Sequence, residues 1–323
     1  MVRSLPLLFL SGLFLMGTIV LLRWLEFRTW RRELVTYRLR FPRDIDPKAV
    51  TAFLAGLSGL VAPRWQRLTA VRAVVFETGA TSKGITHHLI LPRSLAAIAL
   101  SQLRAALPNV AVEEDADYRA VRPKLAGELG LSSAIRPLRT DDPAATSTAI
   151  LASLQPLEPG ETVLLQWVVS PAGPIKPVQP RSHNARNGAA KTLLENVTTQ
   201  VGTGEELRAA RAKQSRPLFQ VAGRVGAVAA SPARARLVLQ RLTAALHGAN
   251  APGAHLRRRA VPSGSSSRQL QRRAVPLVRQ PCLLNAAELT ALVAFPLNGP
   301  QVPGLQLGGC RQLAPCFAPR HIG

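Results

Sequence analysis

An uncharged stretch at the N-terminus constrains this chain more than any other feature. Residues 4–22 form a run of nineteen without a charge, in which Leu, Phe, Ile and Val dominate. In a helix that rises about 1.5 Å per residue, such a run nearly spans a bilayer core of roughly 30 Å. A buried helix of a soluble domain fits less well, because residues 5–22 have no polar face. The sequence therefore predicts a transmembrane helix.

The residues around this stretch predict its orientation. It continues directly into arginines, whereas a cleaved signal peptide ends in small residues, so we expect the helix to be retained as an anchor. Only Arg3 precedes it, but seven Arg lie between positions 23 and 43. Positive charge gathers on the cytoplasmic side, which predicts a single-pass protein of the inner (cytoplasmic) membrane with the bulk of the chain in the cytoplasm. The candidate membrane-interface residues are Trp24, Arg28, Trp30, Arg31 and Arg32.

Residues 32–118 follow the pattern of a small α/β unit. Alternating and β-branched runs predict strands, and apolar residues at helical spacing predict the helices between them. The expected elements are a strand at 32–41, a helix capped by Asp46 before Pro47, strands at 70–77 and 85–91, a helix capped by Ser94, and a strand at 109–113. This β-α-β-β-α-β order is that of a ferredoxin-like unit.

The order recurs more weakly in residues 119–262, with an insertion near 171–215 that is rich in Pro and basic residues. The fold class predicted is therefore α/β (α+β), with an N-terminal transmembrane helix followed by two ferredoxin-like βαββαβ sandwich units. Residues 1–31 would form the anchor and a basic juxtamembrane segment. Residues 263–323 are interpreted as a linker with a capped helix at 285–295 and a Pro/Gly-rich tail.

Positive charge dominates the chain and gathers in its C-terminal third. Lys and Arg number 41 against 18 acidic residues, which gives a net charge of +23. Residues 207–287 contain fifteen basic residues and no acid. Without internal partners such groups favour a phosphate backbone or an anionic lipid surface. The possible anion-binding residues are Arg257, Arg258, Arg259, Arg272 and Arg273. The alternative is that these basic residues form an ordinary solvent-exposed surface, because the stretch has no nucleic-acid-binding motif.

Motifs for catalysis are missing from the sequence. No Gly-Lys pair exists that could form a Walker A loop, and no GxSxG or HExxH motif occurs. His87 and His88 are adjacent in a predicted strand, so they would face opposite sides, one buried and one exposed. The acidic group at 113–117 is typical of a solvated strand end. Cys310, Cys316 and His321 lack a standard metal-ligand spacing. We therefore expect no enzyme activity in this chain, no cofactor and no metal.

One segment near the C-terminus is similar to a known bacterial family. Residues 283–296 read Leu-Leu-Asn-Ala-Ala-Glu-Leu-Thr-Ala-Leu-Val-Ala-Phe-Pro, in which Asn285 can cap a helix and Glu288 can complete a capping box. Together with the N-terminal helix and the two α/β units, this segment resembles the region ahead of the motor domain in conjugation and type IV secretion ATPases of the HerA/FtsK class. The order of the elements is similar over nearly the whole chain, but the amino-acid sequence itself is similar only in residues 283–296.

The resemblance implies a role in DNA transfer without catalysis by this chain. Such ATPases continue into an ATP-binding core with Walker motifs, so a longer parent protein would be an ATPase. We therefore expect a membrane-anchored, non-catalytic assembly region that docks a DNA-translocating motor or channel component. Its partners would be the membrane, other secretion or motor components, other copies of itself and DNA. The alternative is a membrane-tethered basic module that binds nucleic acid or anionic lipid through residues 207–279.

Overall fold

Nine strands form one antiparallel sheet in the computed structural model, which describes residues 5–63, 69–173, 179–180, 200–201, 204–276 and 281–308. The strand order is β10-β5-β9-β6-β2-β3-β1-β4, and β11 pairs along β9 beside this path. The strands are β1 (Leu34–Arg40), β2 (Val74–Thr81), β3 (Gly84–Pro92), β4 (Ala111–Glu114), β5 (Leu125–Leu131), β6 (Thr162–Pro171), β9 (Leu218–Val228), β10 (Leu256–Arg258) and β11 (Cys282–Asn285). Two short strands, β7 (Gln179–Pro180) and β8 (Gln200–Val201), pair separately.

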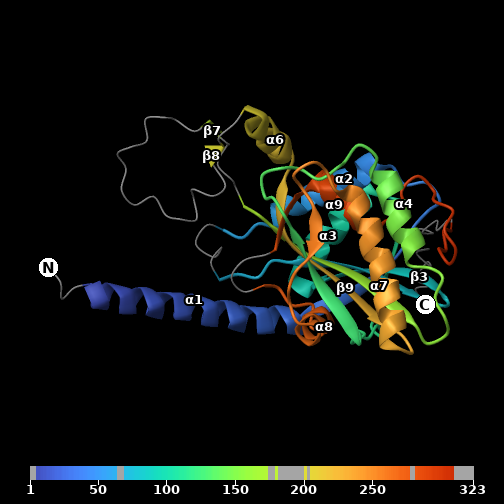
Figure 1. Cartoon of the computed structure of the whole chain (residues 1–323), viewed down its shortest axis with the longest axis horizontal. Helices are drawn as coiled ribbons and strands as arrows, with labels where there is room; N and C mark the ends of the chain where they lie inside the picture. Colours follow the sequence, from blue (N-terminus) through green and yellow to red (C-terminus); the bar gives the residue numbers. More distant parts are fainter. Residues whose placement is uncertain are drawn as a thin grey trace, which may run out of the picture.

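Helices cover both faces of the sheet unequally (Figure 1). One face packs against α2 (Pro47–Gly56), α3 (Arg93–Ala106), α4 (Pro143–Ser153), α7 (Pro232–Leu246) and α9 (Ala286–Leu292). The opposite face meets α8 (Ser263–Gln271) and the end of α1 (Leu5–Arg32). The remaining described helices are α6 (Gly204–Gln214) and the 3-10 turns η1 (Leu57–Leu60) and η3 (His247–Ala249). Because both faces are covered, polar strand residues are buried on either face, for example Glu77 on one and His87 on the other.

The fold predicted from the sequence is wrong in its first element and in its separate units. No helix in the described part of the chain is both long enough and apolar enough to cross a membrane. Charged residues recur in α1 from Arg23 onward, and Trp30 in its last turn is buried against the body, whereas a span needs about 20 apolar residues. The same finding contradicts the expected location in the inner membrane. The strands of the two expected units lie in one continuous sheet.

Each half of this sheet has the same connectivity. β1, α2, β2, β3, α3 and β4 give the spatial order β4-β1-β3-β2, and β5, α4, β6, β9, α7 and β10 give β10-β5-β9-β6. The two halves meet where β2 pairs with β6, in a register that runs from Val74 opposite Val169 to Thr81 opposite Thr162. Without this pairing, β2 and β6 would each be the edge strand of a separate sheet. The hydrogen bonds between them join the halves into a single sheet. The excursion expected at 171–192 lies largely outside the described residues.

Local capping explains where most helices start. The Asp46 side chain accepts a hydrogen bond from the Lys48 backbone N–H at 2.8 Å, with Pro47 at the first helical position, as predicted. Asp142 and Ser231 cap α4 and α7 in the same way. Ser94 is the exception. Helix α3 begins at Arg93, directly after Pro92, without a side-chain cap.

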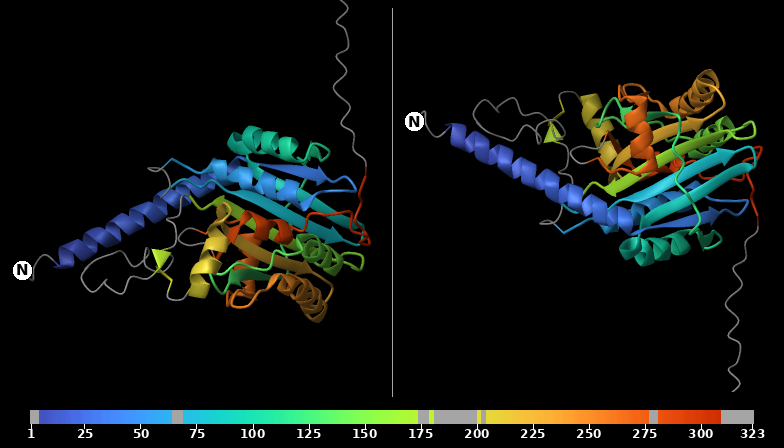
Figure 2. Two further views of the ribbon diagram at one scale, coloured as in Figure 1. Left: turned by 90° about the horizontal axis from the view of Figure 1, so that it is seen from above. Right: turned by 90° about the horizontal axis from the view of Figure 1, so that it is seen from below.

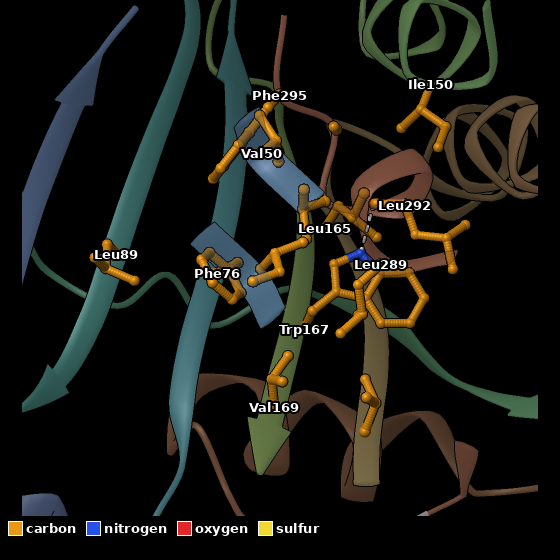
Figure 3. Close-up of a cluster of buried hydrophobic side chains, with 14 of the residues drawn as sticks. Val50, Phe76, Leu89, Ile150, Leu165, Trp167, Val169, Leu289, Leu292 and Phe295 are labelled. Carbon is orange, nitrogen blue, oxygen red and sulfur yellow. Dashed lines mark hydrogen bonds between the residues drawn. The ribbon is translucent and has the colours of Figure 1, made fainter. Parts of the chain in front are cut away.

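The C-terminal segment that we interpreted as a linker contributes to the centre of the body. Helix α9 lies between α2 and α4 on the sheet face that carries the main core. The Trp167 indole N–H, from β6, donates to the Leu292 carbonyl at 2.8 Å, and Phe76 and Phe295 make an edge contact nearby (Figure 3). α9 therefore joins elements of both halves of the chain.

Trp30 fixes the end of α1 to the opposite face of the sheet. Its side chain is 4% exposed and packs with Val75 and Ile90, and its indole N–H donates to the Ala73 carbonyl at 3.2 Å. Trp30→Phe keeps a large ring and removes this donor, which leaves a buried carbonyl with one partner fewer. We expect a loss of about 1 kcal/mol in the free energy of unfolding, measured by urea denaturation. An unchanged denaturation midpoint would show that the hydrogen bond contributes nothing to stability.

Candidate functional site

A row of polar side chains crosses the sheet on the face that α8 covers. Residues that lie opposite each other in antiparallel strands point to the same face. From β4 to β5, the row consists of Glu113, Arg38, His88, Glu77, Gln166, Arg224 and Glu128. Five of these side chains, from β3 to β5, are less than 5% exposed. Burial of so many polar groups requires partners for them, and the structure supplies most of these within the row and from α8.

Glu77 is the central acceptor of the row. Its carboxylate accepts hydrogen bonds from the Tyr118 hydroxyl at 2.8 Å, the Gln166 amide at 2.6 Å and Arg273 Nε at 3.0 Å. Arg273 adopts a backbone φ of 52°, which an L-residue rarely adopts and which the ion pair helps to hold. Burial, with Glu77 as the second cause, raises the pKa of Tyr118 well above its usual value. Tyr118 therefore stays a hydrogen-bond donor at all ordinary pH values.

The same row holds α8 in place. Gln166 donates to the Leu270 carbonyl at 2.9 Å and Arg224 donates to the Ala274 carbonyl at 2.6 Å, so the carbonyls at and just beyond the end of α8 are partnered. Arg224 is 1% exposed, and burial lowers its pKa to about 10, so it remains charged at neutral pH. Helix α8 has four serines and a single buried leucine, Leu270. Polar contacts from the sheet, more than apolar packing, therefore position this helix.

The two adjacent histidines face opposite sides of β3, but both are buried. His87 Nε2 lies 2.8 Å from the Ala294 carbonyl, and burial lowers the pKa of His87 to about 4. His88 stacks on Tyr118 with ring centroids 4.0 Å apart, and burial lowers its pKa as well. The expectation of one exposed histidine is wrong, because it assumed that one face of the sheet is open to solvent. His88 Nε2 also lies 3.5 Å from Asp115 Oδ2.

A second buried charge pair joins α6 to α9, on the sheet face opposite the polar row. Lys213 Nζ lies 2.6 Å from Glu288 Oε2, and the two side chains are 2% and 0% exposed. The predicted capping box is confirmed: the Asn285 side chain accepts from the Glu288 N–H, and Glu288 accepts from the Asn285 N–H at 2.7 Å. Burial lowers the pKa of Lys213 and raises that of the neighbouring Cys282 thiol to about 12. A paired amine and a protonated thiol are poor nucleophiles, so this arrangement is structural.

Three of the five candidate anion-binding arginines contact acceptors elsewhere in the described structure, and the other two are exposed. Arg273 pairs with Glu77, Arg259 pairs with Glu128, and Arg258 donates to the Ala126 carbonyl at 3.0 Å. Arg257 and Arg272 are exposed, one on β10 and one after α8. The assumption that the basic residues of 207–287 lack internal partners is therefore wrong for several of them, which weakens the alternative of a charge-driven binding module.

The candidate membrane-interface residues do not share one environment. Trp30 is a core residue, as described above. Trp24 is 41% exposed, and the Arg28 guanidinium lies 4.7 Å from its ring centroid. Arg31 and Arg32 are exposed at the end of α1. The burial of Trp30 in protein contacts is incompatible with a headgroup position for this part of the helix.

In the described part of the chain, neither a group of metal-ligating side chains nor the cavity below provides a second site. No cluster of three or more His, Cys, Asp or Glu side chains suited to a metal occurs among the described residues. Cys310, Cys316 and His321 lie outside them. A cavity of about 50 Å³ lies between β1, β3 and residues 305–307, and it is far smaller than the roughly 300 Å³ of a small ligand pocket.

Most of the exposed large apolar side chains in the described part of the chain lie on α1. The helix projects from the body as a rod in all views (Figures 1 and 2). Its exposed apolar side chains are Phe14 (79% exposed), Leu15 (61%), Met16 (59%), Leu21 (55%), Leu22 (45%) and Leu25 (46%). Exposed apolar surface of this extent on one element is typical of an interaction site.

Comparisons with known proteins assign no family to the chain. No protein-family model matches it, and a search of the curated proteins finds no match. The geometry of its own residues must therefore support any statement about function.

Proposed function

We propose that this chain is a non-catalytic assembly module that joins copies of itself through α1. The observation that carries the proposal is the exposed apolar side chains along a helix that projects from a body covered on both faces. Burying such side chains in a helix pair stabilises an assembly by roughly 1.5–3 kcal/mol for each large residue. A second α1 is a suitable partner, because it offers the same apolar surface to the first.

Three substitutions on one side of α1 test this proposal. Phe14, Leu21 and Leu25 recur at spacings of seven and four, so they lie on the same face of the helix. In the full chain, F14K/L21K/L25K should weaken self-association at least about 100-fold, because three apolar contacts are replaced by like charges. Sedimentation velocity over a concentration series measures the change.

A matched control separates apolar contact from added charge. E26K/T29K changes the net charge by the same amount, at two exposed positions that are already polar. We expect the control to associate nearly as the unmodified chain does. A chain that is monomeric at every concentration, or a triple variant that associates normally, would contradict the proposal.

The assignment to DNA transfer is the finer part of the proposal and is supported by the resemblance of residues 283–296 to the segment ahead of the motor in conjugative secretion ATPases. The capping box that carries this resemblance is built into the core beside both halves of the sheet. In the host, replacing the gene with the F14K/L21K/L25K variant should lower plasmid transfer, measured as mating frequency. Normal transfer with confirmed loss of association would reject the DNA-transfer role and leave the assembly role intact.

A further inference from the structure

The continuous sheet ends in two strands of opposite charge. β4 lies at one end of the strand path and β10 at the other, and neither has an outer neighbour in the described part of the chain. Four of the 18 acidic residues of the chain lie between positions 113 and 117, on and just after β4. At the other end, Arg257 and Arg258 lie on β10, and Arg259 follows the strand directly. In a chain with a net charge of +23, an acidic edge is an exception.

Both edges present backbone groups that can pair with another strand. The Asp115 N–H donates to the Thr36 carbonyl, and the Arg259 N–H donates to the Glu128 carbonyl. Hydrogen-bonded and non-hydrogen-bonded pairs alternate along an antiparallel ladder. This alternation directs the N–H and C=O groups of Glu114 on β4, and those of Arg258 on β10, away from the sheet. Unpaired edges of this kind template the addition of a further strand.

Side chains at the two edges favour unlike contacts. Glu113 is paired with Arg40 at 2.9 Å, and Arg259 is paired with Glu128. Glu114 and Arg258 are exposed and take part in no described ion pair, and the alternation along their strands puts both on the sheet face opposite the polar row. Two β4 edges would bring acidic side chains together, and two β10 edges would bring arginines together. Only a β4 edge against a β10 edge places opposite charges across the junction.

The direction of the strands permits this contact. Seven antiparallel pairings separate β10 from β4, so the two strands run in opposite directions. When a second copy is placed beside the first with its helices on the same side, its β4 lies antiparallel to β10. The junction then repeats the pairing that joins β2 to β6 within the chain.

We propose that copies of this chain associate head to tail, with β4 of one copy extending the sheet at β10 of the next. The contact is heterologous, so it builds a ring where the rotation between copies closes and a filament where it does not. It uses neither α1 nor any residue of its exposed surface, and it therefore stands or fails independently of the self-association proposed for that helix.

Charge reversal at each edge is the first part of the test. The full chain carrying F14K/L21K/L25K serves as the parent, so that contacts of α1 do not contribute. In this parent, E114R and R258E should each raise the dissociation constant at least about 10-fold, because each places like charges across the junction. The combined variant E114R/R258E exchanges the two charges, and its affinity should return to near that of the parent. Sedimentation velocity in about 50 mM salt measures each constant, since surface charges are weakly screened there.

Mixing the single variants distinguishes this contact from a symmetric one. E114R places an arginine opposite Arg258 of the next copy, and R258E places a glutamate opposite Glu114, so each variant alone should associate weakly. In an equimolar mixture both junctions between unlike variants are complementary, because the arginine introduced in the first meets the glutamate introduced in the second, and the unmodified Glu114 of the second meets the unmodified Arg258 of the first. The mixture should therefore form alternating oligomers of the same sizes as those of the parent, whereas a symmetric contact through one edge would stop at dimers.

Two controls carry the same charge changes away from the edges. D44R and R236E alter exposed residues that lie on neither edge strand, and they should leave the association unchanged. A parent that is monomeric at all concentrations, single variants that associate as the parent does, or a mixture that stops at dimers would each overturn the proposal. If the controls weaken association as much as E114R and R258E do, the effect is that of net charge and the edge contact is rejected.

Discussion

Glu288→Ala lowers the free energy of unfolding by about 3–5 kcal/mol, the largest effect that we expect from a single substitution in this chain. The Glu288 carboxylate accepts hydrogen bonds from Lys213 Nζ, the Leu138 N–H at 2.6 Å and the Asn285 N–H at 2.7 Å. Its loss leaves a buried ammonium group and two buried backbone donors without this acceptor, and each such group costs free energy. Urea denaturation at neutral pH measures the change through the midpoint, with an unchanged m-value.

A double variant shows how much of this cost comes from the unpaired charge. Lys213→Met removes the ammonium group, so Lys213→Met combined with Glu288→Gln should recover part of the stability that Glu288→Gln loses alone. Glu205→Gln serves as the control, because its ion pair with Arg136 is exposed and should contribute less than about 1 kcal/mol. A cost below about 1 kcal/mol for Glu288→Ala would mean that water reaches Lys213 and that the pair is not buried in solution.

Acid destabilises the protein through His87 by about 3 kcal/mol between pH 7 and pH 4. Burial lowers the pKa of His87 from 6.5 to about 4 in the folded chain. Because the folded-state pKa is the lower one, this contribution is fully present above about pH 6.5 and is lost as the pH falls through about 4. The difference between 6.5 and about 4, at about 1.4 kcal/mol for each pH unit, gives the expected size.

His87→Gln isolates this contribution, since the amide can still donate to the Ala294 carbonyl but does not titrate. The fall in unfolding free energy from pH 7 to pH 4 should be smaller in the variant than in the unmodified chain by about 3 kcal/mol. His88, which burial shifts in the same direction, remains in both proteins and cancels in the difference. The exposed His255 is the control, and His255→Gln should leave the fall unchanged. If His87→Gln and the unmodified chain show the same pH dependence of the unfolding free energy, then solvent reaches His87 in the folded chain and the prediction is wrong.

Local signals in the sequence predict where helices and strands form better than they predict which of them pair or pack together. The Asp46 cap and the Asn285 capping box are confirmed, because each involves groups within three residues of one another. The seam between β2 and β6 could not be predicted, since each strand reads as an ordinary buried run and nothing local specifies its partner. Helix α8 was interpreted as part of a linker because its serines and glycine are typical of loops.

The polar contacts were beyond prediction for the same reason. Glu77 and Arg224 are each the one charged residue of a strand that is otherwise mostly apolar, and nothing near them in the sequence shows what covers them. Only the covering of that face by α8 makes them buried. Lys213 and Glu288 are 75 residues apart, and α6 reads as an exposed polar helix. Such pairs are set by tertiary packing, which a single sequence does not display.

The central position of α9 has a consequence for biosynthesis. The helix packs against α2 and α4, which come from opposite halves of the sheet, yet it is made after both. A nascent chain that has not yet released residues 286–292 from the ribosome leaves Trp167 and Phe76 without part of their cover. The final collapse is therefore delayed until nearly all of the described body has been translated, and chaperones that bind apolar segments have their longest opportunity in that interval.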